Sequence, residues 1–277
     1  MVPFTGVGLF NGFRGNQWLK NRVRVFKEFV LPSLLAQGSE DFYVWLQWRP
    51  EERTNAIVKG LQETLGGISN LHVIHTFGGI TFYDDKYDDK VARKRLMNSL
   101  EISLPELKAI VGGAPYVLLT LQPSDDMYLD DTARRLREKF IELLDEKPEN
   151  KRRAVGYKKG YIISYTNKEI AEYTTDSWVS DATSTYHTDT IPPFFTILFP
   201  TDVFLDPQKH FEHMGPYQSH EYIEDVMDYT ALEGRGFVVG THGNNISTTY
   251  NHRYKGRVLN KEETEEMLIR TGALLSA

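Results

Sequence analysis

The stretch Tyr116-Val-Leu-Leu-Thr-Leu-Gln-Pro-Ser-Asp-Asp126 decides the fold that we expect, because an apolar run leads directly into two neighbouring carboxylates. A nearly continuous apolar run is typical of a strand that is covered on both faces, as the strands of parallel sheets are. In an open α/β sheet, ligands bind in the crevice beyond the carboxyl ends of the strands. The sequence therefore predicts that Asp125 and Asp126 face such a crevice.

Strand-like and helix-like segments alternate before this stretch. Aromatic and β-branched residues predict strands at 42–48 and 71–77, and apolar residues at helical spacing predict helices at 18–34, 51–65 and 91–110. Strand–helix–strand order gives parallel pairing with right-handed crossovers. We therefore expect an α/β fold with an open, mainly parallel sheet flanked by helices. Asn16 is the expected cap of the first helix.

The sequence after the stretch is less regular. It predicts helices at 129–144, 219–229 and 260–275, paired strands at 154–160 and 161–165, and further strands at 192–199 and 237–241. Asn260 is the expected cap of the last helix. No long flexible linker or repeat interrupts the chain, so we expect a single domain over residues 1–277.

Composition narrows the class of protein. With 277 residues, 40% of them hydrophobic and 25% charged, the chain is typical of a folded protein. It has no cysteine, which excludes disulfides, thiolate zinc sites and a cysteine nucleophile. A formal net charge of −6 argues against nucleic acid as the main partner. There is neither a signal peptide nor a long apolar run, so we expect a cytoplasmic protein with no transmembrane segment.

Three groups of side chains are candidates for chemistry. The first is the acid pair, since hard divalent ions take oxygen ligands; the alternative is an acidic turn in which Ser124 or Asp125 caps the next helix. The second is His242, which follows a short strand and lies between glycines; the alternative is a loop histidine whose hydrogen bonds are satisfied.

The third group lies on one face of the predicted helix 219–229. Glu221, Glu224 and Asp225 share that face through their spacing, and one of them is a candidate general base. The alternative is an acidic helix start that is favoured by the helix dipole. His210 and His213 have the spacing of zinc ligands, but no pattern supplies a fourth ligand.

The sequence resembles GT-A-type glycosyltransferases and, more narrowly, the rhamnosyltransferase family of bacterial and viral sequences. The segments that carry the resemblance are Leu9-Phe-Asn11, Trp18-Leu-x-x-Arg22, Leu31-Pro-Ser-Leu-Leu-Ala-Gln37, Ser124-Asp-Asp126, Gly156-Tyr, Gly160-Tyr-Ile, Pro192-Pro-Phe-Phe and His242-Gly-Asn-Asn-Ile-Ser247. One departure stands out, because Pro123 takes the place of the first aspartate in the usual Asp-x-Asp motif.

The resemblance implies a GT-A, Rossmann-like fold and the transfer of a sugar from a nucleotide-diphosphate donor to the hydroxyl of a glycan or other acceptor. Residues 1–127 would form the nucleotide-binding half and residues 128–277 the acceptor-binding half. Asp125 would hold Mn²⁺ or Mg²⁺ against the diphosphate, with His242 as a further metal or phosphate contact. Asn11, Arg93, Arg95, Ser124 and Asp126 would bind the donor.

For the acceptor, Asp225 is the expected general base, with Glu224 and Glu221 as alternatives, and attack from behind would invert the anomeric centre. Two other functions stay open. A sugar-phosphate nucleotidyltransferase would use a glycine-rich loop, which Asn11-Gly-Phe-Arg-Gly15 faintly resembles. A non-catalytic carbohydrate-binding protein would explain Pro123 and predicts glycan binding without a metal.

Overall fold

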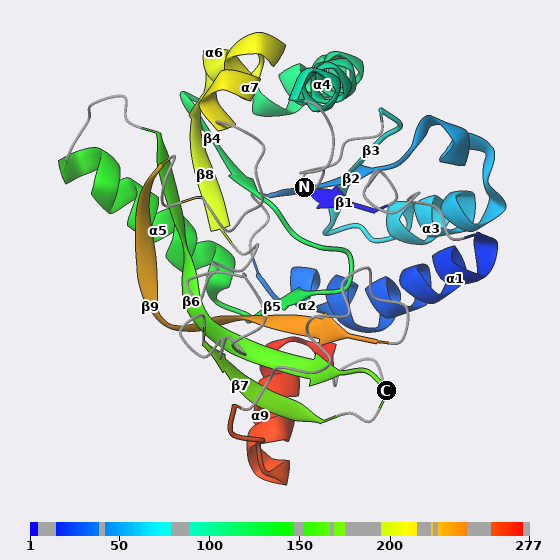
Figure 1. The fold of residues 1–277 in the computed structure, drawn as a ribbon, viewed down its shortest axis with the longest axis vertical. Helices are drawn as coiled ribbons and strands as arrows, with labels where there is room; N and C mark the ends of the chain where they lie inside the picture. Colours follow the sequence, from blue (N-terminus) through cyan, green and yellow to red (C-terminus); the bar gives the residue numbers. More distant parts are fainter. Residues whose placement is uncertain are drawn as a thin grey trace.

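The computed structural model describes residues 1–4, 15–38, 42–78, 89–146, 152–166, 169–174, 195–214, 223, 227–242 and 256–273. The fold is α/β, with two sheets and helices packed around them (Figure 1).

The first sheet is parallel, as predicted. It has three strands in the order β1-β2-β3, formed by Val2–Pro3, Tyr43–Gln47 and His72–Thr76. Phe4 leaves β1 and stacks on Trp48, with ring centroids 4.5 Å apart. This aromatic pair belongs to the core that joins the sheet to the helices over residues 16–35 and 56–66.

The second sheet is mainly antiparallel, so the sheet structure as a whole is mixed rather than mainly parallel. Its strands run in the order β4-β8-β6-β9-β5, with β7 also paired to β6. They are β4 (Tyr116–Thr120), β5 (Met127–Tyr128), β6 (Arg153–Ser164), β7 (Ile170–Thr174), β8 (Phe195–Pro200) and β9 (Asp228–Thr241). Of the strand pairs that the structure describes in this sheet, only β6 and β9 are parallel.

Two backbone hydrogen bonds connect the sheets. Met1 N donates to Thr120 O over 2.7 Å, and Gln122 N donates to Met1 O over 3.0 Å. The start of the chain therefore lies against the end of β4, as Figure 1 shows at the centre of the molecule. Because β4 also pairs with β8, this strand links the parallel sheet to the antiparallel one.

Most predicted helices form within a few residues of their expected bounds. They are α1 (Asn16–Val25), the π-helical turn η2 (Phe26–Val30), α2 (Leu31–Leu35), the 3₁₀ helix η3 (Pro50–Thr54), α3 (Ala56–Gly66), α4 (Asp89–Val111), α5 (Thr132–Glu146), α6 (Thr201–Phe204), α7 (Pro207–Met214) and α9 (Lys261–Arg270). The capping box of Asn260 with Glu263 confirms the predicted start of α9. The predicted cap at Asn16 is wrong, because Gly15 is the N-cap and Asn16 Oδ1 accepts from Asn55 Nδ2 instead.

Two predictions about strands are also wrong. The apolar strand β4 is not covered on both faces: Tyr116 and Leu118 are 39% and 37% exposed, and a cavity of about 430 Å³ lies beside them. The expected pair of strands around Gly160 is one strand, β6. Gly160 does not turn the chain there; it leaves room for Phe237, whose ring would lie 2.5 Å from any Cβ.

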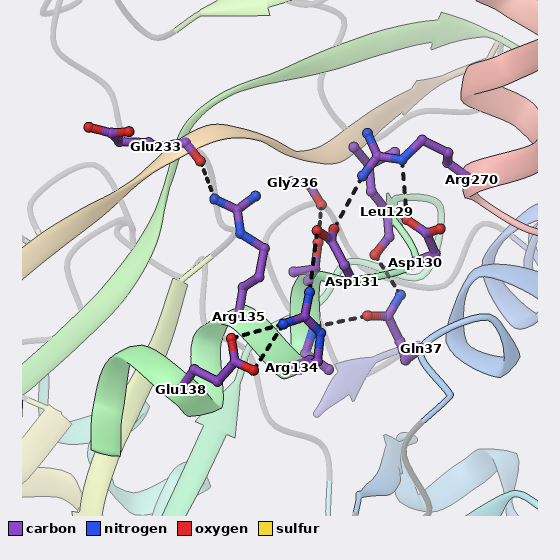
Figure 2. Close-up of polar contacts among 12 residues, drawn as sticks. Gln37, Leu129, Asp130, Asp131, Arg134, Arg135, Glu138, Glu233, Gly236 and Arg270 are labelled. Atoms are coloured by element: carbon purple, nitrogen blue, oxygen red, sulfur yellow. Dashed lines mark hydrogen bonds and ion pairs between the residues drawn. The ribbon is translucent and has the colours of Figure 1, made fainter. Parts of the chain in front are cut away.

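The segment that follows the acid pair is tied to several elements (Figure 2). Gln37, after α2, donates to Leu129 O over 2.8 Å and accepts from Ala133 N over 2.9 Å. Arg270 on α9 donates to Asp130 and Asp131, each over 3.2 Å. The path of the chain between β5 and α5 is therefore set by contacts from both ends of the sequence.

Candidate functional site

The acid pair lies in a buried turn between β4 and β5. Ser124, Asp125 and Asp126 are only 4%, 8% and 5% exposed. The alternative in which Ser124 or Asp125 caps the next helix is wrong, because β5 follows directly and α5 begins only at Thr132. Buried carboxylates need partners, since an unpaired charge away from water is costly.

Asp125 is paired with two side chains from distant parts of the chain. Arg22, on α1, forms an ion pair with Asp125 Oδ2 through its Nη1 atom. His242, directly after β9, brings its Nε2 atom to 3.2 Å from the same oxygen, although 117 residues separate the two in the chain. Arg22 Nη1 is also 3.3 Å from His242 Nε2. Three elements thus converge on one carboxylate oxygen.

The charge of Asp125 depends on this pairing. Burial alone raises the pKa of the Asp125 carboxyl, but the Arg22 guanidinium and His242 outweigh it, so that the pKa lies below its ordinary value. The Asp125 side chain is therefore a carboxylate at neutral pH, held in a compact cluster with a cation.

Asp126 has a different role from its neighbour. Its Oδ1 atom accepts from the backbone N–H of Gly240 over 2.7 Å, which ties the acidic turn to β9. Burial raises the pKa of Asp126 well above its ordinary value, and the charge of Asp125 raises it further. The two acids are thus distinguished by their surroundings: Asp125 pairs with Arg22 and His242, whereas Asp126 accepts from the backbone of β9.

Tyr165 and Gly240 complete the packing around the turn. The Tyr165 hydroxyl donates to Asp125 O over 2.7 Å, and its ring stacks on Phe29 with centroids 4.2 Å apart. A Cβ on Gly240 would lie 2.0 Å from Asp125 O. The backbone of β9 can therefore approach the acidic turn this closely only with glycine at this position.

Arg22 is a site residue to which sequence reasoning gave no role, although it closes the Trp18-Leu-x-x-Arg22 segment of the resemblance. The residue is 4% exposed, its guanidinium lies 5.3 Å from the centroid of the Trp18 ring, and its Nε atom has no hydrogen-bond partner within the described part of the chain. A signal was present, because Arg22 falls on the buried face of α1 with Trp18, Leu19 and Val25. A charged residue on an apolar helix face is rarely left without a partner.

No contact in the described part of the chain joins the other predicted site residues to this cluster. Arg93 and Arg95 lie on α4, and their side chains are not among those described. Asn11, Glu221, Glu224 and Asp225 lie outside the described residues. His210 and His213 each donate to a backbone carbonyl, of Phe204 and Leu198 respectively.

The cluster does not fit a resident divalent ion in this arrangement. Asp125 Oδ2 and His242 Nε2 would have to face the ion, yet both lie against the Arg22 guanidinium. Asp126 is directed at Gly240 N, and the described residues contain no group of three or more possible metal ligands. The expected role of Mn²⁺ or Mg²⁺ stays a prediction.

No family model matches the sequence, and no curated protein matches it. Within the described ranges, no helix has the length and apolar character needed to cross a membrane. The features that bear on function are therefore the cluster and the sheets that position it.

Proposed function

We propose that the protein is a GT-A-type glycosyltransferase. It moves a sugar, rhamnose in the family that the sequence resembles, from a nucleotide-diphosphate donor to the hydroxyl of a glycan or other acceptor. The observation that carries this proposal is the buried cluster of Arg22, Asp125 and His242 at the carboxyl end of β4. The end of β4 adjoins the parallel sheet through the hydrogen bonds of Met1 with Thr120 and Gln122, and ligands of parallel α/β sheets bind beyond the carboxyl ends of the strands.

The arrangement of the sheets supports the same function. The parallel strands β1, β2 and β3 come before β4 in the chain. The second sheet continues from β4 through β8, which belongs to the later part of the chain. In the proposal, residues 1–127 bind the nucleotide and residues 128–277 bind the acceptor. The cluster draws on both halves, because Arg22 and Asp125 come from the first and His242 from the second.

The reaction requires that the acceptor oxygen bonds to the anomeric carbon while the bond from that carbon to the diphosphate breaks. The proton of the acceptor hydroxyl goes to a general base, for which Asp225 is the proposed residue and Glu224 or Glu221 the alternatives. Attack opposite the leaving group inverts the anomeric centre. Asn11, Arg93, Arg95, Ser124 and Asp126 are the proposed donor-binding residues.

The proposal is tested by thermal unfolding of the full chain with UDP, dTDP, GDP, ADP and CDP, each with and without Mn²⁺. A ligand at a hundred times its dissociation constant adds about 2.7 kcal/mol to the free energy of unfolding, which raises the midpoint by several degrees. We expect one diphosphate to stabilise the protein and the Asp125→Ala variant to lose the effect. If none stabilises at millimolar concentration, the proposal is wrong.

Two results would point to the other functions. Turnover of a nucleoside triphosphate with release of pyrophosphate would identify a sugar-phosphate nucleotidyltransferase. Stabilisation by glycans, with no response to any nucleotide, would identify a carbohydrate-binding protein.

A further inference from the structure

We infer that Arg22 is the cation of the Asp125 site, so that its guanidinium, and not a divalent metal ion, supplies the positive charge that binds the donor diphosphate. The inference rests on the proposed function, because it assumes that a diphosphate binds at the acidic turn. The resemblance in sequence instead implies that Mn²⁺ or Mg²⁺ supplies this positive charge.

The first argument is the position of the guanidinium. Arg22 Nη1 forms the ion pair with Asp125 Oδ2 and lies 3.3 Å from His242 Nε2. These are the two atoms that would face a metal ion in this turn. An ion bound to Asp125 at a normal distance, about 2.1 Å for Mg²⁺, would meet the guanidinium there. Arg22 and a metal ion thus compete for one place.

The second argument is that Arg22 is held in position. Its side chain is 5% exposed, and Trp18 lies beside the guanidinium. Asp125 is in turn fixed by the Tyr165 hydroxyl, which donates to its backbone carbonyl. A charge placed in advance in a buried site needs no rearrangement when the diphosphate develops negative charge.

The third argument concerns the donors of Arg22. The Nε atom is buried and has no hydrogen-bond partner within the described part of the chain. A buried donor without a partner is costly, so its presence at a site calls for an explanation. The planar guanidinium matches the oxygens of phosphate groups and binds them through paired N–H donors. A diphosphate oxygen is a suitable acceptor for this donor.

The test is isothermal titration of the full chain with inorganic pyrophosphate and with the five nucleotide diphosphates, in buffer with EDTA and again with Mn²⁺. We expect wild-type protein to bind at least one of these ligands in EDTA, and Mn²⁺ to change the dissociation constant by less than about threefold. Loss of a charged hydrogen bond in Arg22→Gln should weaken binding by tenfold or more. Arg22→Lys should recover part of the affinity, because it keeps the charge without the planar donors.

Arg24→Gln is the matched control, because Arg24 lies on the same helix, its side chain is 62% exposed, and it forms an ion pair with Glu28. It should bind as the wild type does. Arg22→Gln leaves Asp125 buried without its cation, so folding is checked by circular dichroism. If the variant unfolds, Arg22→Gln combined with Asp125→Asn removes both charges, and it too should lose metal-free binding.

The possible results separate the inference from the proposed function. If diphosphate binds only with Mn²⁺, or binds in EDTA and is unaffected by either Arg22→Gln variant, the inference is overturned while the transferase proposal stands. If no diphosphate or pyrophosphate binds to the folded wild-type protein with or without Mn²⁺, both are overturned.

Discussion

At the scale of single residues, the acidic turn depends on how closely β9 approaches it. Gly240 donates its backbone N–H to Asp126, and a side chain at this position would meet Asp125 O and the Tyr165 ring. The backbone of Gly240 therefore helps to position both acids and packs tightly against the acidic turn.

We expect Gly240→Ala to lower the free energy of unfolding by about 3 kcal/mol, because the added methyl group must push β9 away from the turn. Urea denaturation followed by circular dichroism measures the change. Gly60→Ala is the control, since nothing lies within 4 Å of a Cβ on Gly60 in α3 and alanine favours a helix. A Gly240→Ala protein as stable as the wild type would contradict the geometry of the turn.

At the scale of elements, Gln37 joins α2 to the start of α5 (Figure 2). Its Nε2 atom donates to Leu129 O and to Ser33 O, and its Oε1 atom accepts from Ala133 N. Gln37 closes the Leu-Pro-Ser segment on which the family resemblance partly rests. The structure gives that residue a physical role, which is to hold the chain just after the acidic turn.

We expect Gln37→Glu to destabilise the protein by about 2 kcal/mol, because a carboxylate cannot donate to the two carbonyl oxygens that the amide contacts. Urea denaturation followed by circular dichroism measures the change, because the carboxylate can still accept from Ala133 N and loses only the two donated bonds. Gln17→Glu, at an exposed position on α1, is the control and should leave the stability unchanged. A Gln37→Glu protein as stable as the wild type would show that these two donated hydrogen bonds do not hold the segment.

At the scale of the whole molecule, the half-buried His75 and the buried His210 connect stability to pH. His75, on β3, accepts from Trp48 Nε1, and His210, on α7, donates to Phe204 O. Burial lowers the pKa of each from the ordinary 6.5 to about 4. His75 belongs to the parallel sheet, and His210 lies beside the antiparallel sheet. We therefore expect acid to weaken the packing around both sheets.

Because the unfolded chain takes up protons at these histidines below pH 6.5 and the folded chain does so only near pH 4, stability should fall as the pH drops between those values. For His210 alone the loss is about 3 kcal/mol. Urea denaturation at pH 7, 5.5 and 4 measures it. His210→Asn keeps a donor for Phe204 O without titrating, so its stability should depend less on pH. An equal dependence in wild type and variant would argue against a neutral, buried His210.

Local features of the fold were predictable from the sequence. The strands at 43–47, 72–76 and 116–120 and the cap of the last helix were found from side-chain periodicity and capping chemistry. The formation of these strands and of this cap depends on residues that are only a few positions apart in the chain. The position of the acid pair after a strand was also evident, although its partner Arg22 was not.

The sequence by itself determined where most helices of the first half and the strands β2, β3 and β4 lie, and that two carboxylates follow an apolar strand. Only the tertiary structure decided that β4 pairs antiparallel with β8, that one face of β4 is exposed, and that Arg22 and His242 meet Asp125. The physical reason is that periodicity and capping act between near neighbours in the chain. Strand direction and the pairing of buried charges depend instead on how distant segments pack together.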